Sequence, residues 1–379
     1  MTHIFIVSEK TFKTHLQYMF AGTGHGEVIP DFIGCTKESK KADYDEKTFA
    51  SMIADISKIR VGDRIAFYVT GCKKVFGFFK AKSSPFFNSK SNDYLGNELG
   101  RYLPFRVLIE PDEVFEKGIT EHEALDCIEN VVHPYEMCWS LIYRKLTGMR
   151  GCSFITDFES KRLYDQIATK NSNRALQTDN QYDYDDEYKI IKVTSNANTY
   201  SGATTTSLEI KPRLLEIKNS FETHLQAYIS QNYDKDELHG LLFPNTEPDN
   251  SWFGNEVVCS VGEQRIDCML MCETKDNFYI RVIELKDEPP SADLVKIQLD
   301  WYLKWVRQYI VPQINKNVII IPTIIAPQNK RDCDNKTNFI KAFNEFNNTK
   351  TLKAKNFTIK KIEFISFDRV SDISFKKVL

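Results

Sequence analysis

The sequence predicts two folded domains, a mixed α+β or small-barrel domain followed by an α/β domain. Its 379 residues exceed an ordinary single domain and suit two or three. Residues 1–168 alternate short apolar runs with turn signals, whereas from residue 211 a helix, strands, a helix and further strands follow in order. Between these sections, residues 169–210 are rich in Asn, Ser, Thr, Asp and Gly and lack apolar periodicity, which predicts a polar linker.

The composition excludes several classes of protein. Hydrophobic residues make up 42% of the chain, which is enough for real cores and excludes wholesale disorder. The N-terminal MTHIFIVSEK has no signal-peptide pattern, and the most apolar later stretch, residues 318–327, is too short to span a bilayer. Nine cysteines at irregular spacings suit free thiols in a reducing compartment. We therefore expect a cytoplasmic protein with no membrane partner.

Charge is distributed unevenly along the chain. The net charge of −2 argues against a non-specific nucleic-acid coater. Lysine and arginine nevertheless concentrate in residues 58–82, and residues 350–361 hold five lysines and no acid. Each cluster is either a solvated face or a polyanion-binding face.

The first section reads as strands interspersed with helices. Short apolar runs predict strands at 3–7, 63–69, 74–81 and 102–109. Helical periodicity predicts helices around 11–20, 46–58, 121–131 and 157–167.

The second section has a different order. Apolar spacing predicts one amphipathic helix over 214–232, followed by a hairpin over 265–286. A second helix follows over 291–310, with Ser291 as its N-cap. Residues 317–327 and 358–367 supply two more strands.

The predicted hairpin places two acids in register. It reads RIDCMLMCETKDNFYIRVIELK, an apolar alternation that turns over at ETKDN. If the turn is an even-numbered loop centred on Lys275 and Asp276, each residue i faces residue 551 − i. Asp267 then lies opposite Glu284, with Cβ atoms about 5 Å apart. Lys286 projects to the same side as Glu284 because strand side chains alternate faces.

Two carboxylates at that distance repel each other unless a cation lies between them. Oxygen ligands in this geometry suit Mg²⁺ or Mn²⁺. Lys286 is then placed to orient or deprotonate an attacking water and to stabilise negative charge on a phosphate. The alternative is a solvated salt-bridge cluster on a half-exposed face. The apolar residues beside Asp267 and Glu284 predict inner strands and favour the metal site.

The order of a helix with an acid, then D…ExK on a hairpin, then a helix with glutamine resembles the PD-(D/E)xK nuclease fold. The resemblance covers roughly residues 211–330 and lacks the proline of the family name. It implies a catalytic core of Asp267, Glu284 and Lys286, with Glu222 as an extra acidic metal ligand and Gln298 as an accessory catalytic residue. Arg265 occupies a position that is often basic in this family, and we expect it to contact nucleic acid.

The first section resembles the EVE/YTH group of PUA-like β-barrel domains. The matching stretches are HIFIVSEKTFKTHLQYM, RVGDRIAFYV, KVFGFFK and LPFRV. Members bind modified bases, flipped from duplex DNA or presented in RNA, in an aromatic pocket. The resemblance suggests Trp139, Phe5, Ser8 and Tyr68 as pocket residues. Basic side chains interleaved with aromatic ones favour phosphate contacts at a separate set of residues: Arg60, Arg64, Lys73, Lys74 and Lys80.

Together the resemblances imply a PUA-like reader at 1–168, a linker at 169–210 and a PD-(D/E)xK nuclease at 211–379. The expected activity is Mg²⁺- or Mn²⁺-dependent cleavage of double-stranded DNA that carries modified bases, as in type IV restriction enzymes. Cutting both strands needs two catalytic domains, so we expect a homodimer. The alternatives are a structure-specific nuclease acting on branched, mismatched or single-stranded DNA, and a non-catalytic protein that binds modified nucleic acid.

Overall fold

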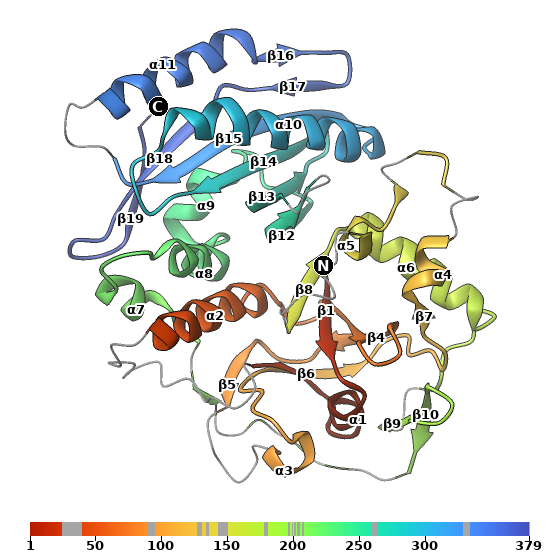
Figure 1. Cartoon of the computed structure of the whole chain (residues 1–379). Coiled ribbons are helices and arrows are strands. Elements are labelled where there is room, and N and C mark those ends of the chain that lie inside the picture. The colour runs from red at the N-terminus through yellow and green to blue at the C-terminus, as the bar shows by residue number, and fades with distance from the viewer. Residues whose placement is uncertain are drawn as a thin grey trace. The chain divides into compact units, whose positions relative to one another are not determined.

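The computed structural model divides the chain into two compact units, Met1–Leu208 and Glu209–Leu379 (Figure 1). The structure describes residues 1–24, 40–88, 95–126, 131–133, 136–142, 151–177, 181–195, 198, 200, 202, 205–206, 208–259, 264–328 and 334–378. Both units mix helices with curled sheets, as the sequence predicts at the level of fold class.

One curled sheet forms most of the first unit. Its strands are β1 (Thr2–Val7), β2 (Phe20–Thr23), β3 (Arg64–Val69), β4 (Lys74–Ala81), β5 (Phe86–Asn88), β6 (Phe105–Pro111), β7 (Ile119–Thr120), β8 (Cys152–Ile155) and β11 (Thr205–Thr206). The order is β11-β5-β6-β4-β3-β1-β8, while β2 also pairs with β6, and β7 with β4. Strands β1 and β3 are parallel, and the other pairs are antiparallel.

The helices of the first unit are α1 (Glu9–Tyr18), α2 (Lys40–Ile56), α3 (Gly96–Leu99), α4 (Glu121–Asp126), α5 (Trp139–Ile142) and α6 (Asp157–Lys170). Helix α1 begins at a capping box in which the Ser8 hydroxyl accepts the Thr11 N–H at 3.2 Å. The four predicted strands are confirmed as β1, β3, β4 and β6, and the four predicted helices are also present. The predicted end of α4, at residues 127–131, falls largely outside the described residues.

The expected linker is not a free tether, because much of residues 169–210 belongs to the first unit. Strands β9 (Gln181–Asp185) and β10 (Ile190–Thr194) form a hairpin, and β11 joins the main sheet. Tyr182 and Tyr184 are fully buried. The Tyr184 ring lies 5.2 Å from that of Phe12, and the Tyr182 ring 5.9 Å from that of Phe79. Burying these rings outweighs the polar composition that predicts a linker.

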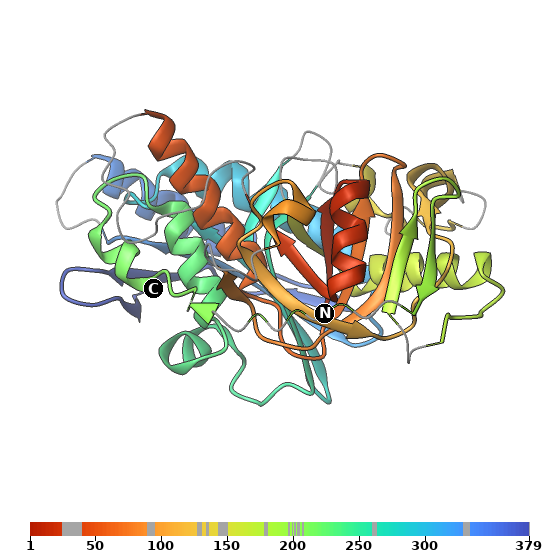
Figure 2. The ribbon, with the colours of Figure 1, turned by 90° about the horizontal axis from the view of Figure 1, so that it is seen from below.

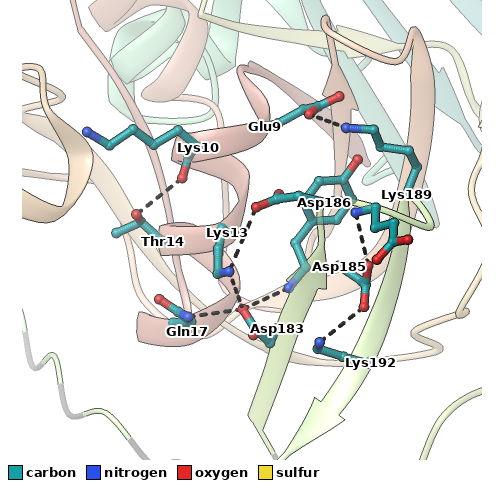
Figure 3. A network of polar contacts seen from close by, with 12 residues as sticks. Glu9, Lys10, Lys13, Thr14, Gln17, Asp183, Asp185, Asp186, Lys189 and Lys192 are labelled. Atoms are coloured by element: carbon teal, nitrogen blue, oxygen red, sulfur yellow. Dashed lines mark hydrogen bonds and ion pairs between the residues drawn. The ribbon is translucent and has the colours of Figure 1, made fainter.

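Ion pairs attach the same hairpin to helix α1. Figure 3 shows the Lys189 ammonium 2.6 Å from a Glu9 carboxylate oxygen, and the Gln17 amide donating to Asp183 at 3.0 Å. Lys13 lies between Asp183 and Asp186, 3.9 Å from each. In Figure 2 the two strands run beside α1. The hairpin therefore covers one side of the helix that leads out of β1.

The second unit is built on a mixed sheet. Its strands are β12 (Asn250–Val258), β13 (Arg265–Glu273), β14 (Asn277–Leu285), β15 (Asn317–Ala326), β16 (Leu352–Lys353), β17 (Phe357–Ile359), β18 (Glu363–Asp368) and β19 (Ser374–Lys377). The order is β12-β13-β14-β15-β17-β16, and β18 pairs with β15 and β19. Strand β15 runs parallel to β14, β17 and β18, whereas the other pairs are antiparallel.

The helices of this unit differ in detail from the prediction. They are α7 (Lys211–Glu216), α8 (Glu222–Asn232), α9 (Asp236–Leu242), η3 (Leu294–Leu299), α10 (Asp300–Trp305), η4 (Val306–Ile310), η5 (Val311–Gln313) and α11 (Asp334–Thr349). The helix predicted over 214–232 is broken, because Ser220 takes a left-handed conformation with φ of 53°. The helix predicted over 291–310 changes from π-helix to α-helix and back.

Helices α7, α8 and α9 cover one face of this sheet. Leu225 and Ile229 of α8 share a buried apolar cluster with Ile283 and Leu285 of β14. This packing fixes the N-terminus of α8 beside the end of β14. Among the described residues, helices long and apolar enough to cross a membrane do not occur.

Candidate functional site

The β13–β14 hairpin has the predicted register. Cys268 pairs with Ile283, and the later pairs continue in the same register to Glu273 with Phe278. The turn closes where the Thr274 N–H donates to the Asn277 carbonyl at 2.9 Å. One further step along the strands brings Asp267 to Glu284. This prediction, made from turn length and alternation, is confirmed.

Asp267 and Glu284 form a carboxylate pair at the end of β14. Glu284 is only 1% exposed. One Asp267 oxygen accepts the Leu285 N–H at 2.7 Å, which holds the aspartate against the strand. Burial and the neighbouring Glu284 raise the pKa of Asp267 well above its usual value. Burial also raises the pKa of Glu284, although Lys286 opposes this.

Lys286 lies between carboxylates. Its ammonium is 2.9 Å from Glu284 and 3.4 Å from Glu222, and it donates to the Leu285 carbonyl at 2.7 Å. The Lys286 N–H donates to the Ile325 carbonyl at 3.0 Å, so parallel pairing with β15 continues to this residue. Burial lowers the pKa of Lys286, but Glu284 and Asp267 outweigh it and the pKa rises. The ammonium therefore remains charged at neutral pH.

Glu222 is the first residue of α8 and belongs to the same cluster. Its side chain is 41% exposed, far more than that of Glu284, and it reaches the site through Lys286. Burial is the main cause that raises its pKa. The structure thus brings together four of the five predicted catalytic residues.

Gln298 does not join them. It lies half-buried in the π-helix η3, and within the described part of the chain it makes no hydrogen bond to Asp267, Glu284 or Lys286. A π-helical turn contains an extra residue and rotates the side chains that follow it. Trp301 is 46% exposed in the α-helical turn that follows, whereas Trp305 is 4% exposed. The prediction that Gln298 assists the site is not supported by a contact.

Two residues not predicted for the site contact it. The Gln226 amide, one turn after Glu222, donates to the Asp267 carbonyl at 3.0 Å. The Tyr302 hydroxyl donates to the Arg265 carbonyl at 2.8 Å, and burial with nearby Glu284 and Asp267 raises its pKa. The i, i+4 spacing of Glu222 and Gln226 was the available sequence signal. The sequence offered no such signal for Tyr302, because an aromatic residue in that helix is typical of the hydrophobic core.

Arg265 is partly neutralised. Its guanidinium lies 3.4 Å from Glu256, which takes a left-handed φ of 50° within β12. The Glu256 carboxylate also accepts from Gln226 at 3.2 Å. Arg265 is therefore held at the rim of the acidic cluster by an internal partner, and contact with nucleic acid would require it to share or exchange that partner.

The carboxylates fit a hard divalent cation with an incomplete protein shell. Groups of three His, Cys, Asp or Glu side chains placed to hold one ion are absent from the described residues. However, the second Glu284 oxygen is buried and has no hydrogen-bond partner there. Such an oxygen is costly unless something occupies its lone pairs. Mg²⁺ commonly takes one or two carboxylates and completes its shell with water or substrate phosphate.

The first unit contains a separate pocket of about 220 Å³. It opens at the C-terminal end of β1 and the N-terminus of α1. Its lining comprises Ile6, Val7, Ser8, Thr11, Gly22, Thr23, Gly24, Thr70, Arg101, Leu103 and Gly151. Thr23 is 1% exposed, and its hydroxyl makes no hydrogen bond to the described residues. An unsatisfied hydroxyl in a pocket wall is a ready contact for a polar ligand.

Of the predicted pocket residues, only Ser8 lines this space. Phe5 is fully buried against Phe67, with ring centroids 6.2 Å apart. Tyr68 is 1% exposed and donates to Glu121 at 3.0 Å, and burial together with Glu121 raises its pKa. Trp139 begins α5 and does not line the pocket. Phe5 and Tyr68 are therefore core residues of the curled sheet, and the structure does not bring the predicted aromatic residues together at this pocket.

The predicted basic residues of the first unit are only partly available. Lys80 pairs with Asp112 at 2.7 Å, and the Arg64 guanidinium lies 3.4 Å from the same aspartate. Lys74 donates to the Lys189 carbonyl at 3.4 Å, and Arg60 to the Ser57 carbonyl at 2.7 Å. Lys73 is exposed. Acidic side chains of the first unit thus partly neutralise the basic residues that were expected to contact nucleic acid.

No family model matches the chain, and no curated protein matches it.

Proposed function

We propose that the protein is a Mg²⁺-dependent endonuclease that reads a modified base in DNA with its first unit and cuts with its second. The observation that carries the proposal is the meeting of Asp267, Glu284 and Lys286 at one end of the β13–β14 hairpin. This agrees with a PD-(D/E)xK fold for the second unit, and the curled sheet of the first unit is compatible with a PUA-like reader.

The acidic residues have a direct chemical use. Asp267 and Glu284 would hold the cation. Glu222 would become a further ligand if its ion pair with Lys286 opened. Bound Mg²⁺ would supply Lewis-acid polarisation of the scissile phosphate and lower the pKa of a bound water. Phosphodiester hydrolysis fits this arrangement better than acyl transfer. The nearby Cys259 is a poor nucleophile, because burial and Glu284 raise the pKa of its thiol.

Lys286 would act through its charge. An ammonium held by Glu284 and Glu222 keeps its proton, so it is poorly suited to be the general base. It is suited to orient the attacking water and to stabilise the charge that develops on the phosphate. The Lys286 backbone N–H donates to the Ile325 carbonyl, and its ammonium donates to the Leu285 carbonyl. These two hydrogen bonds hold the residue in place.

The pocket of the first unit supports the reading half of the proposal. At about 220 Å³ it holds several times the volume of one water, which is about 30 Å³ in the liquid. Ser8, Thr11 and Thr23 supply hydroxyl groups, while Ile6, Val7 and Leu103 supply apolar walls. An extruded base needs this combination of edge hydrogen bonding and apolar contact.

A non-catalytic binding protein is the second candidate, and one observation favours it. The described residues lack a set of three acidic ligands, and Lys286 already neutralises Glu284. On this view the carboxylates and the lysine form a structural ion cluster, and only the pocket and the basic surfaces have a function.

Cleavage of matched plasmids tests the proposal. Unmodified plasmids and plasmids with methylated or hydroxymethylated cytosine or methylated adenine are incubated with Mg²⁺, with Mn²⁺ or with EDTA. We expect metal-dependent cutting of one modified plasmid, lost in Lys286→Gln and Glu284→Gln. The control Glu288→Gln makes the same charge change as Glu284→Gln at an exposed site after β14 and should cut normally. Cutting that ignores modification would indicate a structure-specific nuclease. Failure to cut with either metal would favour the binding protein.

A further inference from the structure

The most basic surface of the second unit is a hairpin remote from the carboxylates. Strands β16 and β17 carry or adjoin Lys350, Lys353, Lys355, Lys360 and Lys361, which we call the lysine hairpin. All five lysines are exposed, and no acid lies between the first and the last. In Figure 1 this hairpin extends from the end of α11. So many like charges within twelve residues repel one another unless an anion binds there.

Internal ion pairs do not explain these lysines. Lys350 lies 3.0 Å from Asp300, but the other four form no ion pair with a residue that the structure describes. Three other lysines of this unit are paired: Lys211 with Asp372 at 2.9 Å, Lys316 with Glu273 at 2.7 Å and Lys377 with Glu363 at 2.6 Å.

Protection of a sheet edge accounts for only part of the cluster. Strand β16 is the edge strand, and a lysine on an edge strand discourages pairing with another chain. Lys353 lies in that strand and fits this role. Lys355, Lys360 and Lys361 lie outside both strands, where they do not block the ladder.

A neighbouring helix adds to the positive charge. The exposed Arg307 of η4 stacks over the Phe357 ring of β17, 5.2 Å from its centroid. The guanidinium is thereby held beside the hairpin. Lysines as point charges together with a positioned arginine are the usual groups that bind nucleic-acid phosphates.

Strand register gives the distance from the carboxylates. Glu284 pairs with Ile324 of β15, whereas Phe357 pairs with Val318, six residues earlier on the same strand. At about 3.3 Å per residue, the hairpin lies roughly 20 Å along the sheet from the acidic cluster. In B-DNA, with about 3.4 Å per base pair, this corresponds to about six base pairs.

We propose that the lysine hairpin binds the phosphate backbone of duplex DNA about six base pairs from the phosphate that is cut. This inference rests on the proposed function and, of the two alternatives that the sequence leaves open for residues 350–361, selects the polyanion-binding face. The hairpin would then contact phosphates irrespective of base sequence and position the duplex on the second unit.

The test compares two triple variants of the full chain. Lys353→Gln, Lys355→Gln and Lys360→Gln remove hairpin charge, whereas Lys211→Gln, Lys316→Gln and Lys377→Gln remove equal charge from paired sites. Binding of a labelled duplex of about 30 base pairs is followed by anisotropy in EDTA at several salt concentrations. Each lost phosphate contact lowers the salt slope by about 0.9, so the hairpin variant should lose about 2.7. The control should change by less than one contact.

A second arm tests position. Duplexes with about 4 or 12 base pairs beyond the cut are cleaved in Mg²⁺. On the long duplex, the hairpin variant should have a higher KM than the wild type and the same kcat. On the short duplex, both constants should equal those of the wild type. A salt slope unchanged in the hairpin variant would overturn the inference even if DNA is cut. So would lysine-dependent binding to anionic lipid vesicles without binding to DNA. A reduced slope in a protein that never cuts would instead refute the nuclease and keep the DNA-binding surface.

Discussion

Replacing Asp267 by asparagine should stabilise the metal-free protein while abolishing cutting. Asparagine keeps an oxygen that can accept the Leu285 N–H, which Asp267 now receives at 2.7 Å. It removes one of two adjacent negative charges, and with it a proposed ligand for the cation. If the two carboxylates are present for chemistry and not for packing, the fold gains from losing one of them.

The size of the gain follows from Coulomb's law. Two unit charges about 5 Å apart interact by about 3 kcal/mol at an effective dielectric constant of about 20. Lys286, 2.9 Å from Glu284, also attracts Asp267 and offsets part of this repulsion. We therefore expect a net gain of about 1–2 kcal/mol at pH 8.

The gain should depend on pH. The pKa of folded Asp267 lies above that of the unfolded chain, so the folded protein holds this proton more tightly. Near the ordinary aspartate pKa of about 3.9 the group is protonated when folded and costs little. As pH rises through the raised folded pKa, the Asp267 charge develops beside Glu284 and wild-type stability falls. The variant should therefore gain little at low pH and most at pH 8.

Urea unfolding in EDTA measures the effect. Tryptophan fluorescence is a suitable probe, since three of the four tryptophans, Trp252, Trp301 and Trp305, lie in the second unit. Added Mg²⁺ at ten times its Kd should stabilise the wild type by about 1.4 kcal/mol and leave the variant unchanged. Asp276→Asn, an exposed turn position, is the control and should change stability by less than about 0.5 kcal/mol. If Asp267→Asn instead loses more than 1 kcal/mol at pH 8, the cluster is a structural salt bridge and our reasoning fails.

Three further predictions concern the first unit. Thr23→Val keeps the shape of the pocket wall but removes a hydroxyl that has no hydrogen-bond partner among the described residues. In competitive cleavage it should reduce the preference for modified over unmodified DNA about tenfold. An unchanged preference would exclude this pocket as the site that reads the modified base. Tyr184→Ala should cost about 3–5 kcal/mol in urea unfolding, whereas a linker tyrosine would cost almost nothing. Burial, with Arg106 nearby, lowers the pKa of His15 from 6.5 to about 3, so wild-type stability should fall as pH drops below 6.5. His15→Phe should remove about 2 kcal/mol of that loss between pH 6.5 and 5, and an unaltered pH profile would contradict the assignment.

The local chemistry of the second unit was predictable because it depends on short-range rules. Strand alternation and turn length alone set which residues of a hairpin face each other, and this placed Asp267 beside Glu284. Glu222 was implied by the family resemblance, because the helix predicted over 214–232 places it in the middle of a helix, whereas α8 begins there in the structure. Gln298 does not contact the cluster, and its place depends on a π-helical turn that no residue pattern in that helix indicates.

The first unit was less predictable because its signals are ambiguous. Alternating aromatics can line a pocket or fill a barrel, and Phe5 and Tyr68 fill it. The pocket instead uses small and hydroxylated residues such as Thr23, which sequence patterns do not distinguish from ordinary strand residues. The expected linker contains a signal for a strand, because Tyr182 and Tyr184 alternate with aspartates in the period of a strand. The polar composition of the segment nevertheless led to the prediction of a linker.

The attachment of the β9–β10 hairpin decides how the two proposed activities can be studied separately. A fragment that stops at residue 168 would leave the rings of Phe12, Phe76 and Phe79 uncovered, because Tyr182 and Tyr184 close over them. Such a fragment would fail to bind DNA through loss of its core, whatever the pocket recognises. A fragment that ends at Leu208 retains both tyrosines and the Lys189–Glu9 pair. Only that longer fragment makes a negative binding result informative about recognition.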